Sequence, residues 1–160
     1  MAIEQVREYF KQFGMEGRIR EFDVSSATVE LAAQALGTAP ERIAKTLAFQ
    51  DGEGCILIVA AGDAKVDNRK FKEQFGMKPR MLPFDDVERL VGHAVGGVCP
   101  FGIRPGVPVY VDKSVERFES VYPACGSSNS AIELKMDELM RYSNAVGMVD
   151  VCKGWADASE

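Results

Sequence analysis

Histidine is almost absent from this chain of 160 residues, which contains only His93. A Ser-His-Asp triad would have to use that residue, and a histidine-rich metal site lacks ligands. The four cysteines, Cys55, Cys99, Cys125 and Cys152, are spread along the chain without a CxxC pair. The spacing therefore provides no half-site for zinc or redox chemistry, and we expect no bound metal and no cofactor.

Long apolar runs are also lacking. No stretch of about 18 apolar residues occurs, so we expect no membrane-spanning helix and no membrane partner. The residues from Met1 to Glu8 mix both charges and lack the basic region and apolar run of a signal peptide. Without a secretion signal, reduced thiols and a cytoplasmic location are the default expectation.

Phosphate-binding fingerprints are missing as well, since neither GxGxxG nor GxxxxGK[ST] is present. The net charge of −5 argues against a long nucleic-acid interface, but it permits binding of one nucleotide or one tRNA end. The densest basic run comprises Lys65, Arg69, Lys70 and Lys72, and we interpret it as a solvated helix face.

The remaining composition is typical of a folded protein, with 46% hydrophobic and 27% charged residues. A length of 160 residues suits one domain spanning residues 1–160, with a core at about 21–150. Strands mixed with short hairpins and helices predict an α/β protein of mixed α+β type. We expect a mixed sheet or part-closed barrel surrounded by helices.

Helix signals occur in several places. Thr28 can cap a helix that ends at Leu36 before Gly37, and Asp67 can cap one that ends at Phe75 before Gly76. A capping box in Thr38-Ala39-Pro40-Glu41 predicts a short helix to Ala44. The other expected helices contain Val6, Phe10 and Phe13, or cover Phe84–Leu90 and Met136–Tyr142.

Strand signals are shorter. A hairpin is predicted from Thr46–Gln50 and Cys55–Ala60, joined by the turn Asp51-Gly52-Glu53-Gly54. The further expected strands are Arg18–Phe22, Lys78–Met81, Val109–Val111, Ser120–Tyr122, Ala131–Leu134 and Ala145–Val151. We expect the tail from Gly154 to Glu160 to be frayed.

Lys45 is the first candidate functional residue. It precedes the apolar run Thr46-Leu47-Ala48-Phe49. A lysine at the mouth of an apolar strand either extends its ammonium to water or holds it over a cleft as a donor. Local pattern alone favours the first interpretation.

The second candidate is the loop Gly96-Gly97-Val98-Cys99-Pro100-Phe101-Gly102. Glycines let a ligand approach the main chain, and successive N–H groups can form an anion-binding nest or an oxyanion hole. A tight turn that only joins two elements is an equal alternative. Cys99, shortly after His93, could be a nucleophile, although a buried apolar role is commoner for such a cysteine.

The third candidate is Gly126-Ser127-Ser128-Asn129, whose hydroxyl and amide groups could bind a ribose or an acyl group. The same residues also suit a local hydrogen-bonded turn, which is their commoner use.

All three of these places carry a family resemblance. The stretch TVELAAQALGTAPERIAKTLAF, from Thr28 to Phe49, resembles the signature region of the YbaK/ProX aminoacyl-tRNA deacylases. VGGVCPFG, from Val95 to Gly102, resembles their glycine loop, with Cys99 where serine is common. The segment from Gly126 to Leu134 resembles their last block, without its usual basic pair and aspartate. The similarity covers about residues 21–150.

The resemblance implies a fold like the editing insertion domain of bacterial prolyl-tRNA synthetases, and hydrolysis of the ester that links a wrong amino acid to tRNA. It implies that Lys45 contacts the terminal adenosine or its phosphate, and that the backbone of Gly97, Val98 and Cys99 holds the scissile carbonyl. A ribose hydroxyl of the substrate would help to orient the attacking water. The remaining substrate-binding candidates are Thr28, Thr46, Gly96, Pro100, Phe101, Gly102, Gly126, Ser127, Ser128 and Asn129.

The implied partners are the acceptor end of an aminoacyl-tRNA and a synthetase acting alongside. Cysteine, alanine or another small amino acid on tRNA(Pro) is the implied cargo. A non-catalytic module that binds a nucleotide or an aminoacyl ligand stays open as the alternative, as does a hydrolase that uses Cys99 with His93.

Overall fold

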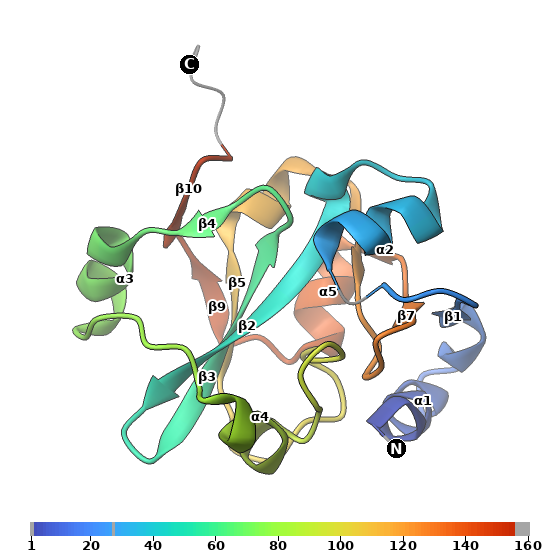
Figure 1. Ribbon diagram of the computed structural model, residues 1–160, viewed down its shortest axis with the longest axis horizontal. Coiled ribbons are helices and arrows are strands. Elements are labelled where there is room, and N and C mark those ends of the chain that lie inside the picture. Colours follow the sequence, from blue (N-terminus) through green and yellow to red (C-terminus); the bar gives the residue numbers. More distant parts are fainter. Residues whose placement is uncertain (1, 27, 156–160) are drawn as a thin grey trace.

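A six-stranded mixed sheet organises the computed structural model, which describes residues 2–26 and 28–155 (Figure 1). The strand order is β8-β6-β2-β3-β5-β9. The bounds are β2 Ile43–Asp51, β3 Gly54–Ala61, β5 Val109–Asp112, β6 Ser120–Pro123, β8 Leu134–Lys135 and β9 Gly147–Val149. The β2–β3 and β6–β8 pairs are antiparallel, and the β2–β6, β3–β5 and β5–β9 pairs are parallel. The sheet curls into a half-barrel, and the predicted fold class is confirmed.

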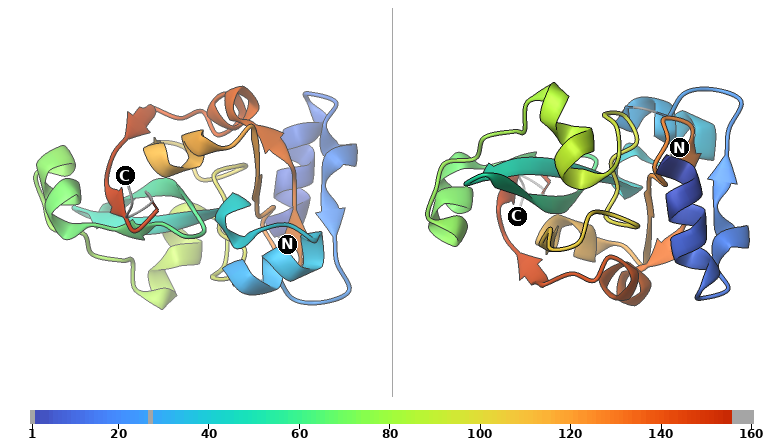
Figure 2. Two further views of the ribbon diagram at one scale, coloured as in Figure 1. Left: turned by 90° about the horizontal axis from the view of Figure 1, so that it is seen from above. Right: turned by 90° about the horizontal axis from the view of Figure 1, so that it is seen from below.

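Two small ladders and five helices complete the described residues. Strand β1 (Arg20–Glu21) pairs with β7 (Ser130–Ala131), and β4 (Lys65–Val66) pairs with β10 (Cys152–Lys153). The helices are α1 Ala2–Lys11, α2 Val29–Leu36, α3 Asn68–Phe75, α4 Phe84–Val91 and α5 Met136–Tyr142. Figure 2 shows α3 at one end of the sheet and α1 at the opposite end.

Local capping chemistry sets the limits of two helices as predicted. The Thr28 hydroxyl accepts a hydrogen bond from the Leu31 N–H at 3.1 Å, and the Asp67 carboxylate accepts one from the Lys70 N–H at 3.0 Å. Both helices end at a glycine in the left-handed region, at φ 68° for Gly37 and 72° for Gly76. These contacts satisfy backbone groups that a helix end otherwise leaves unpaired.

The hairpin prediction is also confirmed. β2 and β3 pair from Ala44↔Ala61 to Asp51↔Gly54. β3 lies between two other strands, and its residues from Cys55 to Ala61 are buried. A continuous apolar run is what a strand covered on both faces requires.

The predicted helix up to Ala44 is wrong. A 3₁₀ helix, η2, covers only Pro40–Arg42, and its N-cap Ala39 makes no side-chain hydrogen bond. β2 then begins at Ile43, so Lys45 lies inside the strand. Pairing with β3 and β6 forms several backbone hydrogen bonds at once. A single helical turn forms few and still has an unfavourable nucleation free energy.

Several short elements also differ from expectation. Of the predicted strand Arg18–Phe22 only Arg20–Glu21 forms a strand, β1, because Arg18 ends the 3₁₀ helix η1 (Glu16–Arg18). The predicted strand Lys78–Met81 makes only an isolated bridge from Met81 to Phe49. The predicted strand at Ala131–Leu134 divides into β7 and β8. The last predicted strand shortens to β9, and the 3₁₀ helix η3 (Lys113–Arg117) was not expected.

The end of the described chain is better held than predicted. The Trp155 carbonyl accepts a hydrogen bond from Arg117 Nη1 at 3.0 Å, and the Trp155 indole donates to the Cys152 carbonyl at 3.3 Å. A frayed tail beginning at Gly154 is therefore wrong for Trp155, and residues 156–160 lie outside the described residues. Within the described ranges, no helix has the length and apolar character needed to cross a membrane.

Candidate functional site

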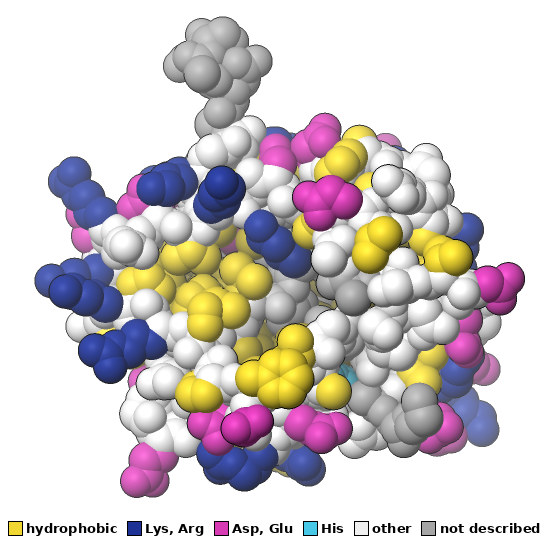
Figure 3. All heavy atoms as spheres, in the orientation of Figure 1, with side chains coloured by type: hydrophobic (Ala, Val, Ile, Leu, Met, Phe, Trp, Pro, Cys, Tyr) yellow, Lys and Arg dark blue, Asp and Glu magenta, His cyan; other side chains and the backbone are white. Residues whose placement is uncertain are grey.

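A cavity of about 470 Å³ lies beside β2, between α2 and α4. Its wall is mostly apolar and combines residues of these elements with Val95, Gly96 and Val98 of the glycine-rich loop. Figure 3 shows apolar side chains gathered around a hollow in this face. A largely apolar concave wall with a few polar groups is the usual form of a small-molecule site.

The outer edge of β2 forms the cavity floor because no strand covers it there. β6 pairs with β2 only at Ile43 and Ala44. The chain returns to this edge where the Leu82 N–H donates to the Ala48 carbonyl at 3.0 Å. Between these points the described residues place no partner strand, so residues from both faces of β2 reach the cavity. The position of a free strand edge is visible only in the tertiary structure.

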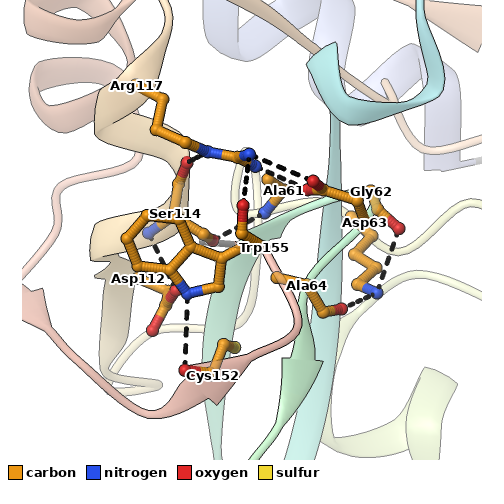
Figure 4. Close-up of polar contacts among 10 residues, drawn as sticks. Ala61, Gly62, Asp63, Ala64, Asp112, Ser114, Arg117, Cys152 and Trp155 are labelled. Atoms are coloured by element: carbon orange, nitrogen blue, oxygen red, sulfur yellow. Dashed lines mark hydrogen bonds and ion pairs between the residues drawn. The ribbon is translucent and has the colours of Figure 1, made fainter. Parts of the chain in front are cut away.

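Lys45 lines this cavity and is half-buried. Its ammonium Nζ donates to the Gly62 carbonyl at 3.4 Å and to the Ala64 carbonyl, both in the turn after β3 (Figure 4). Burial lowers the pKa of Lys45, while Cys152 and Asp63 act in the opposite direction. An ammonium group has three protons, so two carbonyl partners leave one available to a ligand.

Thr46 lies next to Lys45 and also lines the cavity. Its Oγ1 is buried and has no hydrogen-bond partner among residues 2–26 and 28–155. A buried hydroxyl without a partner carries a desolvation cost of about 1–3 kcal/mol. A polar ligand atom that reached this hydroxyl would supply the missing partner.

Thr28 contributes to the cavity wall from the start of α2. Its Oγ1 is already engaged in capping that helix. Thr28 thus both shapes the cavity and fixes α2 beside it.

The glycine-rich loop divides between the cavity and the core. Gly96 and Val98 line the cavity, whereas Cys99 and Phe101 are completely buried. Phe101 packs on Phe10 with ring centroids 4.8 Å apart. Pro100 is also buried, and Gly102 faces the backbone of Gln5 in α1, so Pro100, Phe101 and Gly102 are not brought to the cavity.

Gly97 joins two of the predicted places. A Cβ on Gly97 would lie 2.6 Å from the Gly126 carbonyl carbon and 2.7 Å from the Ser127 nitrogen. Only glycine permits this close approach of two backbones. The Gly97 N–H donates to the Ala94 carbonyl at 3.1 Å, so it is not a free donor for a ligand.

The loop from Gly126 to Asn129 does not line the cavity, and its polar groups bond within the loop and to the segment 22–26. Ser127 Oγ donates to Asn129 Oδ1 at 2.9 Å and lies 2.7 Å from the Ser130 hydroxyl, from which it can accept. Asn129 Nδ2 donates to the Phe22 carbonyl at 3.0 Å, and the Ser128 carbonyl accepts from the Ser26 N–H at 2.6 Å. The loop supports the segment before α2, while the neighbouring Ser130 reaches the cavity.

Sequence reasoning missed several wall residues. Met81, Phe84 and Val95 are exposed apolar side chains that line the cavity, and Tyr122 and Ser26 line it too. Phe84 is the first residue of α4, and the N-cap before it is Pro83, where a polar residue would be usual. This apolar helix start was the one sequence feature that could have pointed to Phe84. No comparable feature marked Tyr122 or Ser26.

Cys99 and His93 are close together but are not arranged as a nucleophile and its base. Cys99 Sγ lies 3.5 Å from His93 Nε2. That nitrogen also lies 2.6 Å from the Phe101 carbonyl, which can only accept, so Nε2 carries a proton already. Burial raises the pKa of Cys99 to about 12, which keeps the sulfur a neutral thiol. The geometry therefore does not favour a cysteine hydrolase.

Comparisons with known proteins identify the family to which this chain belongs. A family model described as "Aminoacyl-tRNA editing domain" matches residues 24–142. The chain is 51% identical over 156 residues to "Uncharacterized protein YwhH" of Bacillus subtilis (strain 168), covering 97% of this chain and 99% of the relative. It is 27% identical over 101 residues to a proline--tRNA ligase of Bacillus cytotoxicus, covering 62% of this chain and 18% of the ligase.

A solved structure has a similar fold. The structure described as "a putative trans-editing enzyme for prolyl tRNA synthetase" superposes with a TM-score of 0.85 at 27% identity, covering 96% of this chain and 98% of that one. The family match and the fold thus define an editing-type α+β domain. The chain belongs to the aminoacyl-tRNA editing domain family.

Proposed function

We propose that this protein hydrolyses the ester bond of mischarged aminoacyl-tRNA, acting on tRNA(Pro) that carries cysteine, alanine or another small amino acid. The observation that carries the proposal is Lys45, whose ammonium lies in the cavity wall with two carbonyl partners and one proton to spare. Because the chain belongs to the editing family, we propose that the substrate is an aminoacyl-tRNA, whose terminal adenosine carries a phosphate that this cation can bind.

The cavity has the size for this substrate. A volume of about 470 Å³ lies within the range of small-molecule sites and can hold a ribose with a small acyl group. The acyl side chain would contact the apolar wall, and the ribose would lie nearer Lys45. Larger parts of the tRNA would stay outside, which suits a chain with a net charge of −5.

The chemistry requires water to add to the ester carbonyl and the ribose oxygen to leave with a proton. Lys45 would bind the terminal adenosine or its phosphate, and the Thr46 hydroxyl would hydrogen-bond the ribose or the ester. Because the Gly97 N–H is occupied, we place the scissile carbonyl against the Val98 N–H. A ribose hydroxyl would orient the water, so the protein needs no nucleophile of its own.

The natural setting of this reaction is the cytoplasm, where charged tRNA is made and used. A prolyl-tRNA synthetase is the proposed partner, since a proline--tRNA ligase contains a segment similar to this chain. The synthetase would release the mischarged tRNA, and this protein would clear it in trans.

The test is deacylation of preformed aminoacyl-tRNAs, including Cys-tRNA(Pro) and Ala-tRNA(Pro), by wild type and by Lys45→Ala. We expect wild type to exceed spontaneous hydrolysis for at least one ester, and Lys45→Ala to lose about 100-fold or more. Lys11→Ala is the matched control, because it removes an exposed lysine of α1 that does not line the cavity, and it should leave the rate unchanged.

Two results would contradict the proposal. If wild type accelerates no ester, the alternative of a non-catalytic binding module replaces it. If Lys45→Ala retains the wild-type rate, the reaction does not use the cation in this cavity.

A further inference from the structure

The turn that holds Lys45 is itself fixed by an ion pair on its far side. Arg117 of η3 binds Asp63 through two parallel contacts, Nη1 to Oδ2 at 3.0 Å and Nη2 to Oδ1 at 2.5 Å. Both side chains are about one-quarter exposed, at 26% and 28%. Figure 4 shows the guanidinium between Asp63 and Trp155. A bidentate, partly buried pair of this kind is stronger and more directional than an ordinary surface pair.

The guanidinium is held in place from several directions. Its Nε donates to the Ser114 carbonyl at 2.9 Å, and its Nη1 donates to the Trp155 carbonyl. Its Cζ lies 4.7 Å from the centroid of the Phe118 ring and 5.1 Å from that of the Trp155 ring. Arg117 therefore has little freedom to move away from Asp63.

The same network reaches the backbone at the start of the turn. Ser114 Oγ accepts from the Ala61 N–H at 3.1 Å. The Ser114 N–H donates to the buried Asp112 carboxylate at 2.9 Å, and that carboxylate also accepts from the Val151 N–H at 2.9 Å. Contacts from η3, β5 and residues 151–155 therefore fix residues 61–64.

The other side of the turn is equally constrained. Gly62 lies so close to the Pro40 carbonyl and the Val29 side chain that a Cβ there would overlap both. The Gly62 and Ala64 carbonyls, which accept from Lys45 Nζ, flank Asp63 in the sequence. A backbone movement at Asp63 would therefore move the two acceptors that position the ammonium.

We propose that Asp63 and Arg117 are positioning residues for Lys45, holding the 61–64 turn so that the lysine ammonium points one proton into the cavity. This inference rests on the proposed deacylase function. Neither residue lines the cavity, so both act through the turn rather than by touching substrate.

Two alternative accounts make different predictions. Asp63 could act only by its charge, one of several that act on Lys45 together with Glu30, Lys65 and Cys152. In that case Asp63→Asn and Arg117→Gln, which remove opposite charges, would shift the pH profile of kcat in opposite directions. The pair could instead serve stability alone, and then both variants would lower stability without lowering kcat.

The experiment compares Asp63→Asn, Arg117→Gln and the double variant by hydrogen–deuterium exchange of residues 61–64 and by kcat over a pH series. We expect each single variant to speed exchange in the turn and to lower kcat by about 10-fold to 100-fold. The double variant should lose no more than either single one, because both remove the same link. Arg117→Lys, which keeps the cation without the paired contacts, should fall between wild type and Arg117→Gln.

Arg18→Gln is the matched control. It removes another bidentate pair, Arg18 with Glu138 at 2.8 and 3.2 Å, from elsewhere on the surface, and should leave exchange at 61–64 and kcat unchanged. Two results overturn the inference when the wild type is active. One is a normal kcat in the Asp63 and Arg117 variants, and the other is a shift of their pH profiles in opposite directions. An inactive wild type instead overturns the proposed function, so the two failures are distinguishable.

Discussion

At the scale of single residues, a substitution of Thr46 is expected to change stability and activity in opposite directions. Its Oγ1 is buried without a partner among the described residues, so Thr46→Val should remove a desolvation cost while keeping the shape of the side chain. We expect the free energy of unfolding in urea to rise by about 1 kcal/mol, and the deacylation rate to fall. Thr28→Val is the comparison, because it removes a helix cap and should lower stability. A Thr46→Val variant with unchanged activity would show that no substrate atom uses the hydroxyl.

At the scale of elements, the contact between the two predicted loops depends on Gly97. In Gly97→Ala the new Cβ would overlap the backbone of Gly126 and Ser127, so one loop must move. We expect a loss of about 1–3 kcal/mol in unfolding free energy and a lower deacylation rate, since Gly96 and Val98 would shift in the cavity wall. Gly17→Ala is the control, because its Cβ would meet nothing within 4 Å. Equal stability of both variants would show that the loops separate easily.

At the scale of the whole molecule, four buried free thiols link stability to pH. Burial raises the pKa of Cys99 and of Cys152 to about 12, whereas an unfolded thiol titrates near 8.5. The unfolded state therefore loses these protons first. Their contribution to stability is full below about pH 8.5 and is lost as pH rises towards about 12, by up to about 1.4 kcal/mol per pH unit for each thiol.

This linkage can be measured as unfolding free energy in urea between pH 8 and pH 10.5. Cys99→Ala should be less stable at pH 8, because it leaves a small cavity, but its stability should decline less steeply above pH 9. The comparison of slopes isolates Cys99 from the lysines and tyrosines that titrate in the same range. Identical slopes would contradict the assigned pKa.

Much of the local structure was readable from the sequence because its causes are local. Thr28, Asp67, Gly37 and Gly76 set helix limits through contacts within a few residues, and the Asp51–Gly54 turn determines the hairpin. The expectation failed where distant pairing decides the outcome. η2 stops at Arg42 since β3 and β6 draw Ile43 and Ala44 into the sheet.

The sequence by itself determined the mixed α+β class and the family motifs around Lys45 and the glycine-rich loop. Only the tertiary structure decided which motif residues reach the cavity. Lys45, Thr46, Gly96 and Val98 line it, whereas Phe101 and Asn129 serve the core and a supporting turn. The physical reason is that the cavity depends on contacts between segments far apart in the chain. The free edge of β2 and the Asp63–Arg117 ion pair both arise from such contacts, which a local sequence pattern does not show.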